Sequence, residues 1–111
     1  MSCVESPVYV RLNVEVGRSV KLPCNTSVKR DIMWTYDNDD DGYVHYVYWK
    51  ERTDSDWPRL FIKPTADNLH NLGITDAELN DTGLYDCYDG KGMRKVGYQL
   101  TIAGMISMCL L

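Results

Sequence analysis

The most informative stretch of this sequence is Asp81-Thr82-Gly83-Leu84-Tyr85-Asp86-Cys87. Tyr85 and Cys87 alternate with Asp86, which favours a β-strand over residues 83–88, because successive side chains of a strand point to opposite faces. A second strand is expected over residues 94–102. The sequence between them, Asp89-Gly90-Lys91-Gly92, carries two glycines that suit a tight hairpin.

The same alternation dominates the rest of the chain, and no stretch of a dozen residues keeps the apolar spacing of a helix. A single helical turn within residues 75–81 is the one helical feature expected. The other expected strands cover residues 12–16, 20–24, 31–36, 43–49, 59–63 and 69–75. Roughly eight or nine short strands, spaced about ten residues apart, predict an all-β sandwich of two sheets.

Composition limits the function classes. The 111 residues include 12 Lys plus Arg against 16 Asp plus Glu, for a formal charge of -4. A nucleic-acid groove or a surface for anionic membranes needs clustered basic side chains, so neither is expected. Apolar residues make up 44% of the chain, which is enough to bury one hydrophobic core.

The four cysteines are Cys3, Cys24, Cys87 and Cys109. None belongs to a CxxC pair, so a zinc knuckle or a thioredoxin-type motif has no support, and a disulfide is favoured.

Two N-x-Ser/Thr sequons predict glycosylation at Asn25 and Asn80 and a secretory origin. Because no signal peptide opens the chain, Met1 is expected to come from recombinant expression or to stand in place of a removed signal peptide.

The stretch 81–87 resembles the D-x-G-x-Y-x-C pattern at the start of strand F in immunoglobulin-superfamily domains, and the resemblance extends over about residues 7–102. It implies a V-set, two-sheet antiparallel sandwich with Greek-key connections. It also implies a disulfide between Cys24 and Cys87, with Trp34 of strand C packed against it.

Other parts of the resemblance concern the base of the sandwich. Tyr85 would bury its ring and return its hydroxyl to the backbone as a tyrosine corner, two residues after Gly83 of the same pattern. Arg59 would pair with Asp81 in a charge-assisted bond, as in V-type domains.

Residues 43–57 are long enough for strands C′ and C″, which favours the V-set over the constant type.

The end of the chain resembles a joining segment only in its second half, because Arg94-Lys95 replaces an aromatic-glycine pair. The expected domain covers residues 1–103, and residues 104–111 are an apolar tail or a truncated stalk or transmembrane start. That tail is shorter than the roughly 20 residues that span a bilayer. Cys3 and Cys109 are expected at opposite ends of the sandwich, too far apart to bridge each other.

An acidic segment between the third and fourth expected strands resembles the opening of a calcium loop. Asp37, Asp39 and Asp41 precede Gly42 with the spacing of such ligands, but Tyr48 stands where a bidentate Glu would be needed. The favoured interpretation is an acidic hairpin tip that keeps the domain soluble, and no metal is expected.

Aromatic and methionine residues are frequent in the strands that the resemblance assigns to one sheet, C, C′, F and G. If Trp34, Tyr85 and Cys87 point inward, the residues that alternate with them point outward. An outward sheet rich in Tyr, Met and Trp is typical of a protein-binding surface, although such rings also cover core edges in monomers. The residues predicted to contact a partner are Met33, Tyr46, Tyr48, Trp49, Tyr88, Met93 and Tyr98.

These features predict a non-enzymatic recognition domain of an immune-type or cell-adhesion receptor, extracellular and either secreted or on the cell surface. His45 and His70 lack the neighbours of a zinc site or a catalytic triad, and no cofactor is expected. The expected partner is another V-type domain, either a second copy of this chain or a different one. Acidic residues of the C–C′ tip and basic residues near the F–G hairpin would supply complementary rim charges, namely Asp37, Asp39, Asp40 and Asp41 against Lys91, Arg94 and Lys95. The alternative is a soluble innate-immune binder of microbial glycans.

Overall fold

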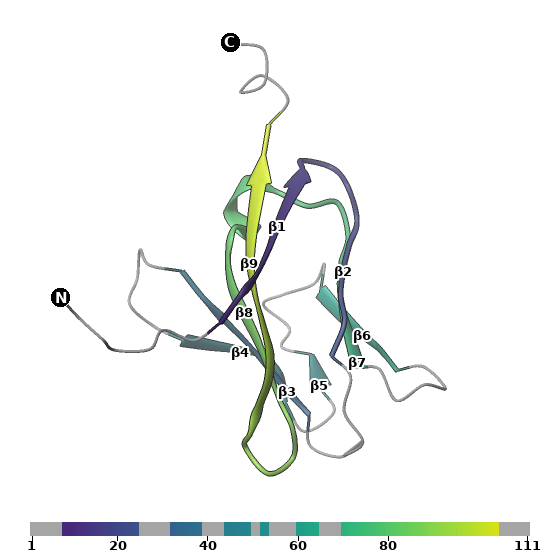
Figure 1. The fold of residues 1–111 in the computed structure, drawn as a ribbon. Helices are drawn as coiled ribbons and strands as arrows, with labels where there is room; N and C mark the ends of the chain where they lie inside the picture. The colour runs from purple at the N-terminus through teal and green to yellow at the C-terminus, as the bar shows by residue number, and fades with distance from the viewer. Residues whose placement is uncertain are drawn as a thin grey trace, which may run out of the picture.

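The computed structural model describes residues 8–24, 32–38, 44–49, 52–53, 60–64 and 70–104. These residues form two β-sheets, which confirms the expected all-β class (Figure 1). The larger sheet has the strand order β1-β9-β8-β3-β4-β5, and the smaller sheet has the order β2-β7-β6. In the described residues β1 runs parallel to β9, and the other strand pairs are antiparallel.

Each predicted strand is present, with ends that differ from the expected ones by at most two residues. The chain also forms one 3-10 turn, η1, before β8, where a single helical turn was expected. The elements are β1 (Val10–Glu15), β2 (Val20–Leu22), β3 (Met33–Asp37), β4 (Val44–Trp49), β5 (Arg52–Thr53), β6 (Leu60–Pro64), β7 (His70–Ile74), η1 (Leu79–Asp81), β8 (Gly83–Tyr88) and β9 (Arg94–Ala103). The short strand β5 lies in the segment that was expected to hold the extra V-type strands.

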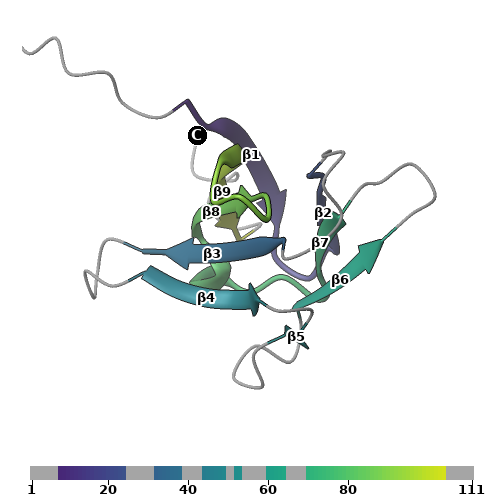
Figure 2. The same cartoon turned by 90° about the horizontal axis from the view of Figure 1, so that it is seen from below.

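Some neighbouring strands come from distant parts of the chain, namely β1 and β9, β3 and β8, and β2 and β7. The connections β1–β2, β2–β3, β5–β6 and β7–β8 pass from one sheet to the other, as in a Greek-key sandwich. Figure 2 shows β2, β7 and β6 grouped apart from β1, β9 and β8. The side chains that fill the space between the sheets are fully buried; the largest are Trp34, Tyr85, Leu22, Ile32, Leu72, Ile74, Leu100 and Val47.

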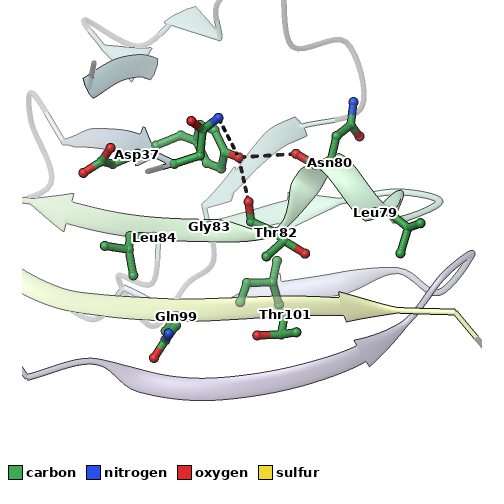
Figure 3. A pocket seen from close by; sticks show the side chains of 11 residues that line it. Asp37, Leu79, Asn80, Thr82, Gly83, Leu84, Gln99 and Thr101 are labelled. Atoms are coloured by element: carbon green, nitrogen blue, oxygen red, sulfur yellow. Dashed lines mark hydrogen bonds between the residues drawn. The ribbon is translucent and has the colours of Figure 1, made fainter. Parts of the chain in front are cut away.

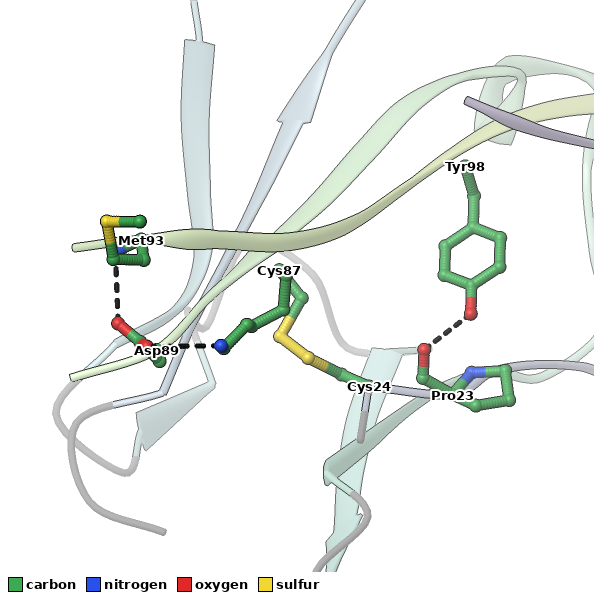
Figure 4. The surroundings of a disulfide bond; sticks show 7 residues. Pro23, Cys24, Cys87, Asp89, Met93 and Tyr98 are labelled. Atoms are coloured by element: carbon green, nitrogen blue, oxygen red, sulfur yellow. Dashed lines mark hydrogen bonds and ion pairs between the residues drawn. A yellow bond between two sulfur atoms is a disulfide. The ribbon is translucent and has the colours of Figure 1, made fainter. Parts of the chain in front are cut away.

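A disulfide joins the two sheets through this core. Cys24, just after β2, is bonded to Cys87 of β8, which confirms the pairing implied by the resemblance (Figure 4). Both cysteines and Trp34 have no exposed surface. The bridge therefore fixes which face of β8 points into the core.

The tyrosine corner is also present. The Tyr85 hydroxyl donates a buried hydrogen bond of 2.6 Å to the backbone carbonyl of Asp81 in η1. The Asp81 carboxylate is itself buried and accepts a 2.8 Å bond from the backbone N–H of Glu78. Arg59, the expected partner of Asp81, lies outside the described residues, so that pair stays a prediction.

Gly83 lies where β3 and β8 approach closely. A Cβ atom at this position would lie 2.5 Å from Cε1 of Tyr36 and 2.9 Å from the backbone oxygen of Asp37. Tyr36 is nearly fully buried and its ring centroid lies 4.9 Å from that of Tyr85, so it has little room to move. The glycine of the 81–87 stretch is therefore required by packing between strands.

We predict that Gly83→Ala lowers the free energy of unfolding by about 2 kcal/mol, because overpacking a rigid site forces neighbouring atoms apart. Guanidinium titration of the oxidised domain measures this change. Gly104→Ala is the matched control, because a Cβ atom there would meet nothing within 4 Å. Equal unfolding midpoints for the two variants would contradict the packing argument.

Candidate functional site: the outer face of the larger sheet

The candidate site is the outer face, which we define as the surface of the larger sheet that points away from β2, β7 and β6. Strand register arranges its residues in three rows. The first row is Arg94, Tyr88 and Met33; the second is Gly97, Asp86, Thr35 and Tyr46; the third is Gln99, Leu84, Asp37 and Val44. The expected outward orientation of Met33, Thr35, Asp86 and Tyr88 follows from this register, because their neighbours Trp34, Tyr85 and Cys87 are buried in the core.

A charged cluster occupies the centre of the outer face. The Asp86 side chain is largely buried, and its Oδ1 accepts a 2.6 Å charge-assisted bond from Nε of Arg94. The hydroxyl of Tyr9, just before β1, donates to Asp86 Oδ2 at 3.3 Å. Nη2 of Arg94 donates to the Val8 carbonyl at 2.7 Å, and its guanidinium lies 4.6 Å from the Tyr9 ring centroid. The cluster therefore connects β8, β9 and the segment that leads into β1.

Gly97 makes this cluster possible. A Cβ atom at position 97 would overlap the Arg94 guanidinium and would lie 2.5 Å from Oδ1 of Asp86 and 2.7 Å from the Tyr9 ring. Because no side chain stands there, Arg94 can fold across β9 and reach the carboxylate. The same environment raises the pKa of Tyr9, first through burial and then through the negative charge of Asp86.

Apolar side chains surround the charged cluster. Val44 is 57% exposed, Tyr46 is 52% exposed and Met93, just before β9, is 62% exposed. Met33 and Tyr88 are half-buried beside them. Burial, and next the charge of Asp86, raises the pKa of the Tyr88 phenol, so this ring is neutral over the physiological range. The outer face is thus an apolar and aromatic rim around an internally neutralised ion pair.

The hairpin between β8 and β9 is held by Asp89, a residue that the sequence analysis did not single out. Its Oδ1 accepts bonds from the backbone N–H groups of Lys91 at 2.8 Å and Met93 at 3.0 Å. Its own backbone N–H donates to the Met93 carbonyl at 2.9 Å. Aspartate at the first position of a turn is a sequence signal for such bonds. The carboxylate fixes the position of Met93 at the rim of the outer face.

Tyr98 was wrongly predicted to contact a partner. It is 7% exposed, it lies opposite Tyr85 across the β8–β9 pairing, and its ring stacks on Trp34 at 6.2 Å between centroids. Its hydroxyl donates to the Pro23 carbonyl (Figure 4). The physical reason is strand parity: Tyr98 alternates with the outward Gly97 and shares the inward side of Leu100.

Tyr48 and Trp49 are two further predicted partner residues that the structure does not place on the outer face. Tyr48 is half-buried and packs against the core, because the β3–β4 pairing shifts register between Trp34 and Thr35. The side chain of Trp49 lies outside the described part of the structure. Of the seven predicted partner residues, the structure places Met33, Tyr46, Tyr88 and Met93 on or beside the outer face.

The acidic segment shows no metal site in the part that the structure describes. Asp37 ends β3 on the outer face, whereas Asp39 and Asp41 lie outside the described residues. Among the residues described, no group of three or more His, Cys, Asp or Glu side chains could hold a metal ion. No helix within the described residues is long and apolar enough to cross a membrane.

A cleft of about 410 Å³ borders the third row of the outer face. It lies between η1 and the adjoining ends of β3, β8 and β9 (Figure 3). The Tyr36 hydroxyl donates to the Thr82 carbonyl at 2.7 Å and lies 3.3 Å from the Asn80 carbonyl, which anchors η1 to β3. The cleft therefore has a rigid wall that carries the sequon residue Asn80.

We predict that Arg94→Gln destabilises the domain by about 2 kcal/mol, because it leaves the buried Asp86 carboxylate without its cationic partner. Urea titration measures the change. Lys95→Gln is the matched control: Lys95 lies 3.7 Å from Asp89 at the exposed end of the hairpin, and its loss is expected to cause no resolvable change. A similar midpoint for both variants would show that the central pair does not stabilise the fold.

We also predict that the β8–β9 hairpin loses order in acid. The N–H groups of Met93 and then Lys91 hold the pKa of Asp89 below its ordinary value. Because the folded pKa is depressed, the stabilisation is complete above the ordinary aspartate pKa of about 3.9 and is lost as the pH falls through the lower folded value. The Lys91 and Met93 amide resonances should titrate below about pH 3.9 by NMR. Asp89→Asn should abolish that titration, and a midpoint at or above the ordinary pKa would refute the assignment.

Comparisons with known proteins agree with this geometry. A family model described as the immunoglobulin V-set domain matches residues 7–103. No curated protein sequence matches the chain. Similar solved structures include the ZIG-8 IG1 homodimer, with 26% identity over 93% of this chain and 86% of that chain and a TM-score of 0.69. The ZIG-8–RIG-5 IG1–IG1 heterodimer has 23% identity, covers 93% of this chain and 90% of that chain, and has a TM-score of 0.66.

A third similar structure is a parallel homodimer of the extracellular domain of the voltage-gated sodium channel beta4 subunit, which is described as explaining a role in cell-cell adhesion. It has 20% identity, covers 91% of this chain and 92% of that chain, and has a TM-score of 0.64. Domains of this type with an inter-sheet disulfide are typically extracellular. The family match, the inter-sheet bridge and the strand order together show that this chain belongs to the immunoglobulin V-set family.

Proposed function

We propose that this V-set domain is a non-enzymatic recognition domain of a cell-surface or secreted receptor of immune or adhesion type, and that its outer face binds another V-type domain. The observation that carries the proposal is the apolar rim of that face. Tyr46 and Met93 are more than half exposed, and Tyr88 and Met33 extend the same surface. Exposed aromatic and methionine side chains on a sheet are the composition of protein interfaces.

A second copy of the chain is the simplest partner. In a two-fold interface the same patch meets itself, so each apolar rim covers the other. The similar structures support this choice, because they include IG1–IG1 homodimers and heterodimers. A stable pair would bury about 1,200–2,000 Å² in total.

The structure changes the expected contribution of rim charges. Arg94 is bonded to Asp86 of its own chain, and Lys95 lies near Asp89. These two basic groups are therefore compensated within the domain, and Lys91 at the exposed hairpin turn is the basic residue best placed to meet an acidic partner. Charge complementarity would then affect the rate and orientation of association more than its strength.

We expect the domain to self-associate in sedimentation velocity experiments between low and high micromolar concentration. Tyr46→Ala and Met93→Ala should each weaken association by about tenfold, because each removes an apolar contact at the rim. Val16→Ala is the matched control: Val16 is 44% exposed, but it lies in the turn after β1 and is not part of the three rows or of the β8–β9 hairpin.

A chain that stays monomeric up to high micromolar concentration would refute the homophilic form of the proposal. A screen of glycans at micromolar protein concentration addresses the alternative expected from the sequence. Saturable binding that free sugar competes away, together with a monomeric protein, would replace the proposed function by glycan recognition.

A further inference from the structure

A second cavity lies against the smaller sheet, and we call it the small-sheet pocket. Its volume is about 240 Å³, and residues of β2 and β7 and their ends line it. Strand pairing places Lys21 of β2 beside Gly73 of β7, and Asn71 and Thr75 lie two residues to either side of Gly73. The residues that alternate with these on both strands fill the core. The small-sheet pocket is therefore on the side of the sandwich opposite the outer face (Figure 2).

Asn71 is the unusual residue of this lining. It is only 4% exposed although it alternates with core residues, and its Oδ1 is buried with no hydrogen-bond partner in the described part of the chain. Burying a polar atom without a partner is costly, and such atoms are rare in native structures. The terminal torsion of an asparagine side chain is broad, so the amide can turn to meet a donor in the pocket. A ligand with a hydrogen-bond donor would satisfy this oxygen.

Gly73 gives the small-sheet pocket a flat floor. Asn71 and Thr75 lie about 13 Å apart along β7, and Gly73 is the one residue of this side between them. Glycine inside a strand weakens the strand, and it often marks a place where a ligand approaches the backbone closely. A planar ring can therefore lie directly on the peptide groups of β7.

Lys21 stands beside this floor and is exposed. Its long apolar stem can cover one side of a ring, while its ammonium group is attracted to the face of an aromatic system. The lining thus combines one unsatisfied acceptor, a flat apolar floor and one cation. An aromatic ring with an N–H or O–H group matches all three.

We propose that the small-sheet pocket binds an aromatic ring that carries a hydrogen-bond donor, with indole as the model ligand. The indole N–H donates to Oδ1 of Asn71, the ring lies on Gly73, and Lys21 covers the face of the ring. A volume of about 240 Å³ is below the roughly 300–1,000 Å³ of sites for drug-sized ligands, so a single ring system fits. The ring belongs either to a free small molecule or to a tryptophan side chain of a protein partner.

The first experiment compares two ligands by NMR. The oxidised, isotope-labelled full chain is titrated with indole and, separately, with N-methylindole, which has the same rings but no donor. We expect indole to shift the amide resonances of Lys21 and Gly73 saturably, and N-methylindole to bind about fivefold more weakly because it leaves Asn71 unsatisfied. If neither compound causes a saturable shift, an ordered water alone fills the pocket and the proposal fails. Equal affinities would overturn the role of Asn71.

Asn71→Leu tests the same contact from the side of the protein. It should weaken indole to the affinity of N-methylindole and change the affinity of N-methylindole by no more than about twofold, because the second ligand never used the amide. Asn13→Leu is the matched control, since Asn13 is an exposed asparagine of β1 in the larger sheet, and it should leave both affinities unchanged. A similar loss of both ligands in Asn71→Leu would overturn the donor contact.

The stability of Asn71→Leu separates a ligand-binding residue from a structural one. Without ligand this variant should melt about 3 °C higher than the native chain, because it removes an unpaired polar group from a buried position. A lower melting temperature would show that Asn71 has a partner within the fold, and the proposal would fail.

Gly73→Val tests the floor of the pocket. Valine suits a strand, so the fold should persist, and the NMR spectrum checks this directly. Its side chain should weaken indole and N-methylindole alike, by at least about tenfold, because both rings need the same floor. Unchanged binding in the folded variant would overturn the placement of the ring on Gly73. If the variant does not fold, the Asn71→Leu comparison decides the proposal by itself.

N-acetyltryptophanamide distinguishes the two sources of the ring, because it carries indole as a tryptophan side chain does. An affinity within about threefold of that of indole would assign the pocket to a side chain of a protein partner. Exclusion of this compound while indole binds would assign it to a free small molecule, and either result supports the shared chemistry. These titrations do not depend on self-association, so a monomeric chain refutes the homophilic proposed function and leaves the small-sheet pocket to be decided by its own ligands.

Discussion

The disulfide between Cys24 and Cys87 is the constraint on which the outer face depends. It joins the end of β2 in the smaller sheet to β8 in the larger one and lies fully buried. By closing a long loop it removes about 4 kcal/mol of unfolded-state entropy in the chain-entropy model, a large part of the net stability of a small domain. Because Cys87 must point inward, Asp86 and Tyr88 must point outward. One covalent bond therefore selects which residues of β8 lie on the outer face.

The centre of the outer face follows from a second constraint, the absence of a side chain at Gly97. Arg94 crosses β9 at this point, bonds Asp86 and lies over the Tyr9 ring. Without that space the carboxylate would be buried with no cation beside it, which is costly in a protein interior. Arg94-Lys95, where the chain departs from the joining-segment pattern, thus has a structural role, because Arg94 forms an ion pair within the domain.

The sequence predicted the positions of the strands and the inter-sheet disulfide well, because both depend on local alternation and on the 81–87 stretch. It predicted the outer face less well, because side-chain direction also depends on register. Tyr98 alternates in phase with Leu100 and Ile102, so strand parity predicts its inward direction, whereas its aromatic character alone favours a place on the protein-binding surface. The packing of Tyr48 against the core could not be predicted, since the register shift between Trp34 and Thr35 has no local sequence signal.

The pairing of Asp86 with Arg94 determines what a partner must supply. If Asp86 presented an uncompensated carboxylate, any bound domain would have to bring a cation to the middle of the contact or leave a buried charge unpaired. Here Arg94 and Tyr9 already satisfy both carboxylate oxygens. A partner that binds the outer face, as proposed, would need apolar surface that fits around Tyr46, Tyr88 and Met93. Mismatch in shape rather than in charge would then exclude wrong partners. Since rim charges act mainly on encounter, the affinity of such a contact depends little on salt, whereas its rate of formation remains sensitive to it.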